Sequence, residues 1–520
     1  MKNQIIVRVE EIFMNLKTAY EPYFKIGVAM SRWNMHTKAH TELLKAQFNS
    51  FTAENDMKPM YYLDADACKK DPEKYDLSPA LTFENAIPYL DFAKENKIAL
   101  RGHTLVWHNQ TPKWFFYRNY NENAGLATRK TMLARLENYI HGVLDFVQTN
   151  YPGVIYAWDV VNEAIDDGDF RQSLWLRTVG RDFVEMAFTF ARKYAAPGVA
   201  LFYNDYETAL DWKRDLIIEY ILEPLKAKGL IDGMGMQSHL LMDHPDFKDY
   251  QKALEMYGAL GLEVQITELD MHNADPSEES MHALAMRYQE LFKILVEAKK
   301  SGKANVTAVT FWNLLDENSW LSGFRRETSY PLLFHGKCEA KEAYYKVLEV
   351  VCDPKDIDRF EVNYPEEDYK AVGLTMDRRQ FSPLNMVCNF LKECGTYYLA
   401  TVDGEQARVR PFGTAEIIDG KLCILTGKSK DVSKQIQKNP NVEICAFGEG
   451  RWIRIAGKLV RDDSRDVKVK MLEAYPHLRA SYNEDDDNME VLYFADGTAT
   501  MSSFGAPSRS FPLNGEFPQF

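Results

Sequence analysis

The stretch Ile155–Glu163, IYAWDVVNE, is an apolar run that ends in two polar residues. Seven more short apolar runs lie before and after it, separated by amphipathic stretches such as Arg135–Gln148 and Met281–Lys299. Eight strands that alternate with helices are what a closed (β/α)8 barrel requires. The eight runs are Phe24–Ala29, Ser50–Ala53, Ile98–Gly102, Ile155–Val161, Ala200–Tyr203, Gly233–Met236, Glu263–Thr267 and Ala308–Phe311.

An open, doubly wound sheet is the alternative arrangement of such runs. That fold normally has a glycine-rich turn after a strand, and no GxGxxG pattern follows any of the eight runs. We therefore predict an α/β fold in which residues 1–351 form a (β/α)8 TIM barrel.

The composition excludes several classes of protein. The 62 Lys and Arg residues against 76 Asp and Glu give a net charge of −14, which argues against nucleic acid or an anionic membrane as a partner. The seven cysteines are scattered, and neither CxxC nor HExxH occurs, so we predict no metal site. The apolar run at Ile5–Val7 is too short for a secretory segment, and the expected location is the cytoplasm.

The sequence changes character after residue 351. The segment 352–375 is charged and without periodicity, and we predict a linker there. In residues 376–520, Asp403-Gly404 and Asp419-Gly420 separate alternating runs, which is a hairpin signal. We predict a smaller antiparallel β-barrel with helices at Asn385–Lys392 and Ser429–Gln437 and strands at Tyr397–Val402, Arg408–Ile418, Lys421–Thr426, Val442–Phe447, Arg451–Arg461 and Val491–Phe494.

Polar residues stand at the ends of seven of the eight apolar runs. Active sites of (β/α)8 barrels form at the carboxyl ends of the strands. One polar residue at such an end could simply cap the next helix, but seven together are not explained by capping. These residues and their close followers include Glu54, Asn55, Lys58, His103, Trp107, Gln110, Asn162, Glu163, Asn204, Asp205, Gln237, His239, Glu268, Asp270 and Trp312.

Glu163 and Glu268 follow the fourth and seventh runs, whose ends lie across the mouth of an eight-stranded ring. Two carboxyl groups on either side of a glycosidic bond are the arrangement that glycoside hydrolysis needs. Indole rings can stack on the apolar faces of sugars, which Trp107, Trp312 and Trp320 could do, although core packing is the alternative for these rings.

At these residues the sequence resembles glycoside hydrolase family 10, the β-1,4-xylanases, over about residues 24–350. The motifs are TAENDMK (52–58), GHTLVWHNQTP (102–112), WDVVNEA (158–164), YND (203–205), QSH (237–239), ITELD (266–270) and FWNLLDENSW (311–320). One departure is Asn313, where the family usually has Gly, and it bears on the shape of the aglycone side.

The resemblance implies a role for each matching residue. Glu163 would be the general acid/base and Glu268 the nucleophile of a retaining reaction, with the proton on Glu163 and the charge on Glu268. Asn162 would bond the sugar 2-OH, and His239 with Asp270 would orient Glu268. The remaining sugar-binding positions would be Glu54, Asn55, Lys58, His103, Trp107, Gln110, Gln237, Trp312 and Trp320, and no step needs a metal or cofactor.

In the second domain, YYLATVDGEQARVRPF (397–412), LCILTGKSK (422–430) and QIQKNPNV (435–442) resemble the pyridoxamine 5′-phosphate oxidase-like split barrels, over about residues 380–505. The resemblance implies bound FMN and a homodimer through this domain. Cations, hydroxyls and a helix start together make a phosphate site. The expected phosphate site comprises Arg408, Arg410, Thr426, Lys428, Ser429 and Lys430, and the alternative is a solvated basic edge strand.

The leading hypothesis is a retaining endo-1,4-β-xylanase that acts on xylan or xylo-oligosaccharides. A carbohydrate-binding protein built on an inactive barrel is a different possibility, but the presence of both Glu163 and Glu268 argues against it. A third hypothesis is a flavin-dependent oxidoreductase whose barrel serves as a carbohydrate-recognition module.

Overall fold

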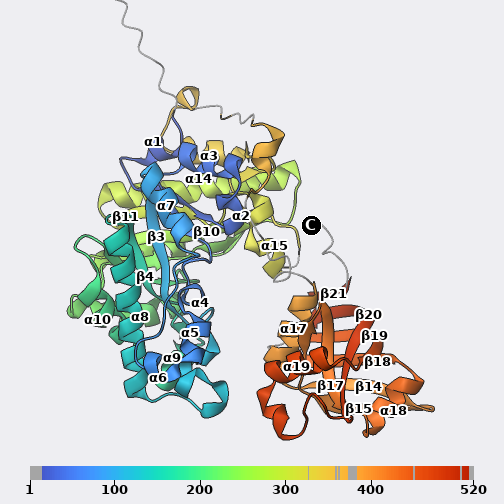
Figure 1. Ribbon diagram of the computed structural model, residues 1–520. Helices are drawn as coiled ribbons and strands as arrows, with labels where there is room; N and C mark the ends of the chain where they lie inside the picture. The colour runs from blue at the N-terminus through green and yellow to red at the C-terminus, as the bar shows by residue number, and fades with distance from the viewer. Residues whose placement is uncertain are drawn as a thin grey trace, which may run out of the picture. The chain divides into compact units, whose positions relative to one another are not determined.

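The computed structural model describes residues 14–325, 327–357, 360, 364–372, 383–448, 451–503 and 506–513. The chain divides into two compact units, Met1–Leu374 and Thr375–Phe520, coloured blue to yellow and orange to red in Figure 1. Each unit is described by itself.

The first unit is a closed barrel of eight parallel strands. Neighbouring strands pair in chain order, and β11 pairs with both β10 and β1, which closes the ring. The predicted (β/α)8 barrel is therefore confirmed. The strands are β1 (Lys25–Met30), β2 (Ser50–Ala53), β3 (Ala99–Trp107), β4 (Ile155–Asn162), β7 (Ala200–Asp205), β8 (Gly233–Met236), β10 (Glu263–His272) and β11 (Asn305–Phe311), and β9 (His239–Leu241) adds to β10.

Two strands run well past the apolar runs that predicted them. β3 continues to Trp107 and β10 to His272, and both stay buried along almost their whole length. The extra residues include His103, Glu268 and Asp270, which are polar but buried. A prediction from apolar side chains ends the strand at such residues, whereas the backbone pairing of the barrel continues past them.

Helices surround the strands of the barrel (Figure 1). Their buried side chains belong to the core of this unit. In α8 (Arg129–Asn150) the buried side chains Leu136, Ile140, Val143 and Val147 recur every three or four residues, the spacing of one helix face. The other long helices are α3 (Lys38–Gln47), α7 (Ile87–Asn96), α10 (Phe183–Tyr194), α13 (Phe247–Ala259) and α14 (Glu278–Ser301).

The shorter helices of this unit lie between these elements. They are α1 (Leu16–Tyr20), α2 (Arg32–Met35), α4 (Pro59–Tyr62), α5 (Ala65–Lys70), α6 (Pro72–Tyr75), α9 (Leu174–Thr178), α11 (Asp211–Ile217), α12 (Glu223–Ala227), α15 (Trp320–Arg325) and α16 (Glu342–Leu348).

The described part of the predicted linker contacts the barrel unit. Ile357 forms a β-bridge with Met14, and Ala371 forms one with Thr37. The rings of Phe360 and Tyr364 pack against the core of the barrel unit, so aromatic residues among the charges anchor this segment. Residues 358–359, 361–363 and 373–375 of the predicted linker lie outside the described residues.

The second unit is built on an antiparallel sheet with the strand order β15-β14-β18-β19-β20-β17-β16, to which β21 adds beside β20. The strands are β14 (Tyr397–Asp403), β15 (Gln406–Phe412), β16 (Glu416–Ile418), β17 (Lys421–Gly427), β18 (Asn441–Gly448), β19 (Arg451–Asp462), β20 (Met489–Ser503) and β21 (Ala506–Pro512). The helices are α17 (Pro383–Cys394), α18 (Asp431–Lys438) and α19 (Arg465–Ala474).

Both predicted Asp-Gly hairpins are present. Gly404 joins β14 to β15 and Gly420 joins β16 to β17, each with a positive φ (63° and 76°) that glycine adopts readily. The predicted strand Arg408–Ile418 is two strands, β15 and β16, which are interrupted at Gly413. The second half of β20 was not predicted, because ADGTATMSS (495–503) carries few apolar residues. The helix α19 was not predicted either.

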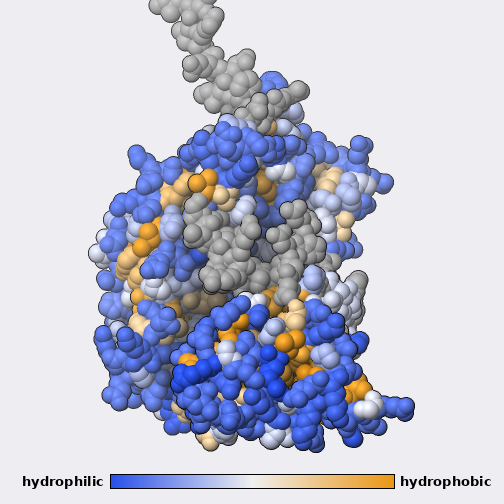
Figure 2. Space-filling model, turned by 45° about the vertical axis from the view of Figure 1, so that its right-hand side comes forward, coloured by the Kyte–Doolittle hydropathy of each residue, from blue (hydrophilic) through white to orange (hydrophobic). Residues whose placement is uncertain are grey.

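Most of the surface visible in Figure 2 is hydrophilic, with smaller hydrophobic patches. Within the part of the chain that the structure describes, no helix has the length and apolar character needed to span a bilayer.

Candidate active site

A cavity of about 620 Å³ lies at the carboxyl ends of the barrel strands. It brings together the predicted site residues of the barrel except Asp270, which lies behind His239. The predicted residues that line it are Glu54, Asn55, Lys58, His103, Trp107, Gln110, Asn162, Glu163, Gln237, His239, Glu268, Trp312 and Trp320.

Glu163 follows the last residue of β4, and three side chains donate hydrogen bonds to its carboxyl group. Trp107 Nε1 lies 3.0 Å from Oε2, while Gln237 Nε2 at 3.0 Å and Asn162 Nδ2 at 3.1 Å bond Oε1. The backbone of Glu163 has a φ of 56°, a left-handed conformation that is uncommon for residues other than glycine. The position of this carboxyl group is therefore fixed from several sides.

Glu268 lies within β10 and is buried. Asn204 Nδ2 donates to its Oε1 at 2.8 Å, and His239 Nε2 lies 3.2 Å from its Oε2. Burial alone would raise the pKa of Glu268, but the hydrogen bond from His239 and the charges of His103, His239 and Lys58 lower it to about 2. Glu268 is therefore ionised at neutral pH, as a carboxylate nucleophile must be.

His239 joins Glu268 to a second buried carboxylate. Its Nδ1 lies 2.9 Å from Asp270 Oδ1, and Trp320 Nε1 donates to Asp270 Oδ2 at 2.9 Å. Burial would lower the pKa of His239, but the charge and hydrogen bond of Asp270 and those of Glu268 raise it to about 10. A protonated His239 thus stands between two carboxylates.

An amide cluster connects the two glutamates. Asn204 Nδ2 donates both to Glu268 and to Asn162 Oδ1, each at 2.8 Å, and Asn162 in turn bonds Glu163. Thr267 Oγ1 donates to Asn204 Oδ1 at 2.6 Å and so fixes the orientation of this amide.

Three polar side chains form another side of the cavity. Lys58 Nζ donates to Asn55 Oδ1 at 3.0 Å, and Gln110 Nε2 donates to the same oxygen at 3.3 Å. Lys58 Nζ also lies 4.8 Å from the ring centroid of Trp107, a cation–π distance. Burial raises the pKa of the neighbouring Glu54, and Lys58 and Asn313 oppose that rise.

The remaining aromatic walls surround the histidines. The ring of Trp312 lies 5.4 Å from His103, and that of Trp320 lies 4.9 Å from His239, both edge to face. His103 Nδ1 lies 2.9 Å from Asp159 Oδ2 beneath the cavity. Trp158 and Trp175, by contrast, are buried in the core.

Asn204 stands at the end of the fifth apolar run, but the sequence predicts no role for it. Its position between Asn162 and Glu268 depends on the pairing of β4 with β7, which a single sequence does not reveal. The cavity also has lining residues that were not predicted, namely Asn109, Tyr206, Glu207, Leu240, Leu321, Phe324 and Arg325.

Comparison with known proteins agrees with this geometry. The sequence pattern of glycosyl hydrolase family 10 matches residues 15–350, which is more than half of the chain. The chain belongs to glycosyl hydrolase family 10.

Two family 10 relatives show how the similarity is distributed. Endo-1,4-beta-xylanase B of Butyrivibrio fibrisolvens is 74% identical over 369 residues, which are 71% of this chain and 58% of that protein. The chain thus matches little more than half the length of that relative. A putative endo-1,4-beta-xylanase of Caldicellulosiruptor saccharolyticus is 40% identical over 313 residues, 58% of this chain and 98% of that protein.

Solved family 10 structures are similar to the barrel unit. An N-terminal endo-1,4-beta-D-xylanase piece from Clostridium thermocellum, complexed with xylohexaose, has a TM-score of 0.61 at 35% identity, covering 66% of this chain and 70% of that one. The intracellular xylanase of Thermoanaerobacterium saccharolyticum has a TM-score of 0.57 at 36% identity, covering 64% of this chain and 98% of that one.

In the second unit, Arg408 and Arg410 lie on the same face of β15, since they pair with Thr401 and Leu399 of β14. Arg410 bonds Thr401 Oγ1 and, at 2.8 Å, Gln435 of α18, whereas Arg408 Nε lies 3.5 Å from Asp403. The other four predicted residues lie where β17 leads into α18. Thr426 is buried, and Lys428 Nζ lies 3.1 Å from Asp463 Oδ1. The Ser429 amide donates to Asn488 Oδ1, and Lys430 is the N-cap residue of α18, without a side-chain capping bond.

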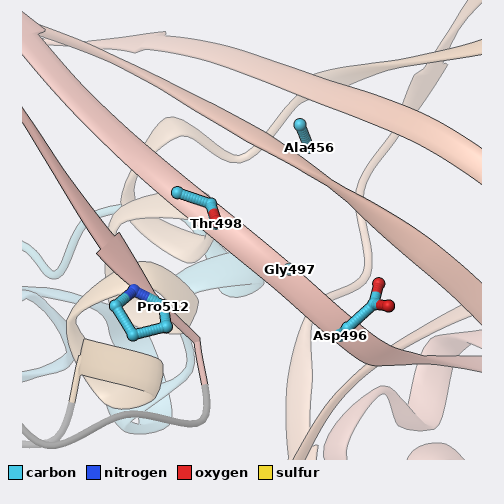
Figure 3. Close-up of a pocket in the computed structure, with 5 residues that line it drawn as sticks. All are labelled: Ala456, Asp496, Gly497, Thr498 and Pro512. Atoms are coloured by element: carbon cyan, nitrogen blue, oxygen red, sulfur yellow. The ribbon is translucent and has the colours of Figure 1, made fainter.

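A separate cavity of about 380 Å³ lies on the sheet of the second unit (Figure 3). Asp496, Gly497 and Thr498 follow one another along β20, with Ala456 on β19 and Pro512 on β21 to either side. This cavity contains none of the predicted phosphate-binding residues. Across the described residues of both units, no group of three or more His, Cys, Asp or Glu side chains is placed to hold a metal ion.

Proposed function

We propose that the barrel unit is a retaining endo-1,4-β-xylanase. The observation that carries this proposal is the pair Glu163 and Glu268, which share one amide cluster in a cavity lined with indole rings. Membership of family 10 and the 74% identical endo-1,4-beta-xylanase B support it. Family 10 chemistry needs no cofactor, and we propose none for this unit.

In the first step, Glu163 donates its proton to the glycosidic oxygen while Glu268 attacks the anomeric carbon from the opposite face. The C–O bond to the leaving sugar breaks, and a covalent ester between Glu268 and the remaining sugar forms. The protonated His239 and the Asn204 amide keep Glu268 charged and oriented for this attack. The positive charge of Lys58 also favours the charged form of Glu268.

In the second step, Glu163 accepts a proton from a water molecule that attacks the ester. The bond to Glu268 breaks, the sugar leaves with its original configuration, and Glu163 regains its proton. Trp107, Gln237 and Asn162 bond the Glu163 carboxyl group, so it can act at the same place in both steps.

The remaining predicted residues would bind the sugar chain. We assign Glu54, Asn55, Gln110 and Gln237 to sugar hydroxyls and Trp312 and Trp320 to the apolar sugar faces. All of them line the cavity, which supports the assignment. His103 would act with them from the floor, where Asp159 orients it.

The configuration of the first product tests the retaining reaction. Proton NMR during hydrolysis of a β-xylo-oligosaccharide should show the β-anomer first, followed by mutarotation. The α-anomer as the first product would mean inversion and would refute the assignment of Glu268 as nucleophile.

For the substrate, we propose xylo-oligosaccharides taken up into the cytoplasm. The structure from Clostridium thermocellum that resembles this barrel is complexed with xylohexaose, and the relative from Thermoanaerobacterium saccharolyticum is described as intracellular. A higher kcat/KM on short oligomers than on insoluble xylan would support the proposal. Recovery of the protein outside the cell would count against it.

We propose further that 352–375 is a linker and that 376–520 is a split barrel which binds FMN and forms a homodimer. The cationic and hydroxyl side chains of β15 and the β17–α18 junction support the phosphate site. Tyr398, Val409 and Phe447, apolar and more than half exposed, support a dimer face on the sheet. The alternative, a flavin-dependent oxidoreductase with the barrel as recognition module, has no observation in its favour.

A further inference from the structure

The chain that follows β11 forms a long segment whose two ends lie side by side. The amide of Leu332 donates to Asp316 Oδ1 at 2.7 Å, so one carboxyl group ties the end of the segment to its beginning. The structure describes this segment except for residue 326. It contains α15 and four of the residues that line the active-site cavity, namely Trp320, Leu321, Phe324 and Arg325.

A buried ion pair closes the base of this segment. Lys341 Nζ donates to Asp316 Oδ2 at 2.7 Å, and the two side chains are only 9% and 4% exposed. The same Nζ donates to the backbone oxygen of Tyr330 at 2.9 Å, and the amide of Lys341 donates to the backbone oxygen of Leu333 at 2.9 Å. Asp316 and Lys341 therefore bind each other and both ends of the segment.

Stability alone does not account for a pair of this kind. Moving two charges out of water costs free energy that their attraction offsets only when the geometry is good, and replacing both partners by apolar residues is often neutral or stabilising. Apolar side chains, however, make no hydrogen bonds to the backbone. The Asp316–Lys341 pair fixes the backbone at Tyr330 and Leu332, which apolar side chains would leave free to shift.

Trp320 connects this segment to the catalytic residues. It follows Asp316 by four residues, its Nε1 donates to Asp270 Oδ2 at 2.9 Å, and its ring lies 4.9 Å from that of His239. A shift at the base of the segment would move this ring relative to the sugar that we assign to it. Even a small misplacement of a group that positions the substrate weakens binding or turnover.

We propose that Asp316 and Lys341 are positioning residues for sugar binding, because their buried pair holds the segment that places Trp320 in the cavity. The inference rests on the proposed function of the barrel unit. It gives the pair no contact with the sugar and no part in bond cleavage, since neither residue lines the cavity.

The test is a double-mutant cycle in the full chain with Lys341→Met and Trp320→Ala, measured as kcat and KM on xylohexaose. Lys341→Met should raise KM at least about threefold. The value of kcat should fall by a smaller factor, because the carboxyl groups of Glu163 and Glu268 are held by other side chains. In the Trp320→Ala background, Lys341→Met should have little further effect on KM.

A second variant separates positioning from stability. Lys341→Met leaves the Asp316 charge buried and unpaired, so its melting temperature should fall. Combining Asp316→Leu with Lys341→Met removes both charges and should recover part of that melting temperature. The KM of this combined variant should nevertheless stay raised at least about threefold, because the bonds to Leu332 and Tyr330 are still missing.

Arg192→Met is the matched control, because the Arg192–Asp232 pair makes the same kinds of bonds at the other end of the barrel. Arg192 Nη2 lies 2.6 Å from Asp232 Oδ2 and donates to the backbone oxygen of Leu230 at 3.3 Å, while Asp232 accepts a bond from the Leu201 amide at 2.8 Å. Asp232 directly precedes β8, so this pair lies away from the cavity. Arg192→Met should leave KM unchanged.

Four results would overturn the inference. They are an unchanged KM in Lys341→Met, an equal rise of KM with and without Trp320, a wild-type KM in the combined variant, and a rise of KM in Arg192→Met as large as that in Lys341→Met. A wild-type chain that does not cleave xylohexaose would instead refute the proposed function, so the two failures are distinguishable.

Discussion

His239 Nε2 lies 3.2 Å from Glu268 Oε2, and this contact explains how a fully buried carboxylate stays charged. The imidazole is held protonated by Asp270, 2.9 Å from its other nitrogen. The charge on Glu268 is therefore maintained by a partner that does not contact the reacting bond in the proposed mechanism. This contact gives the first prediction.

His239→Asn should move the acid limb of the pH–activity profile upward. With His239 present, the pKa of Glu268 is about 2, so acid does not protonate the nucleophile until very low pH. Without His239, its hydrogen bond and charge no longer lower that pKa, so activity should be lost at a pH at least about one unit higher. The check is kcat/KM against pH, with His141→Asn, away from the cavity, as control. Coincident acid limbs for wild type and variant would contradict this account.

Lys213→Met should strongly destabilise the barrel unit. Lys213 Nζ lies 2.8 Å from Asp205 Oδ1, and both side chains are fully buried. Removing one partner leaves an uncompensated buried charge, which costs about 3–5 kcal/mol. The free energy of unfolding in urea measures the effect.

The control for that measurement is Lys193→Met, which breaks a half-exposed pair with Glu137. A solvent-exposed pair of that kind contributes little to the free energy of unfolding. Equal losses in the two variants would show that burial does not determine the contribution of the Lys213 pair.

The loss of stability in Lys213→Met should depend on pH. Burial raises the pKa of Asp205 to about 6, although Lys213 opposes this rise. Below that pH Asp205 is neutral, so Lys213→Met should lose least stability there.

Azide should distinguish the roles of the two glutamates. Glu163→Ala should lose about 10²–10⁴-fold of its activity on poor leaving groups, and azide should partly restore turnover of activated xylosides with a β-configured product. Glu268→Ala should instead yield an α-configured azide, because azide then attacks in place of the nucleophile. Exchange of these two outcomes would reverse the assigned roles.

The second unit should bind FMN with its phosphate near Arg408 and Lys428. Since a hydrogen bond to a charged group contributes about 1.5–3 kcal/mol, Arg408→Ala should weaken FMN binding at least about tenfold. Fluorescence titration measures this, and Arg465→Ala, whose exposed side chain lies at the start of α19, is the control. Protein that takes up no FMN and is monomeric in sedimentation would contradict both the cofactor and the homodimer.

Much of the barrel could be predicted from the sequence, because each strand is an apolar run bounded by helices. The runs at Ser50–Ala53 and Gly233–Met236 coincide with β2 and β8. The ends of β3 and β10 could not be placed in this way, since His103, Glu268 and Asp270 are polar yet buried. The burial of these polar residues depends on the closure of the strands into a barrel and not on the pattern of neighbouring residues in the sequence.

The sequence predicts which residues stand at the strand ends of the candidate site, but not how these residues are connected. The strand-end positions of Glu163 and Glu268 follow from the sequence, whereas the amide of Asn204 that joins them follows only from strand pairing. The positive φ of Asn313 (115°) likewise has no sequence signal apart from the departure of this position from glycine. In the second unit the strand break at Gly413 was missed, because the run from Arg408 to Ile418 reads as continuous.

The central claim, that Glu268 is the nucleophile of a retaining xylanase, is tested most directly by trapping the covalent intermediate. A 2-deoxy-2-fluoro-β-xylobioside with a good leaving group should inactivate the wild-type chain and add one fluoroxylobiosyl group. Peptide mass spectrometry should place that group on the peptide containing Glu268, and Glu268→Ala should remain unlabelled. Turnover without any covalent adduct, or a label on another residue, would contradict the account.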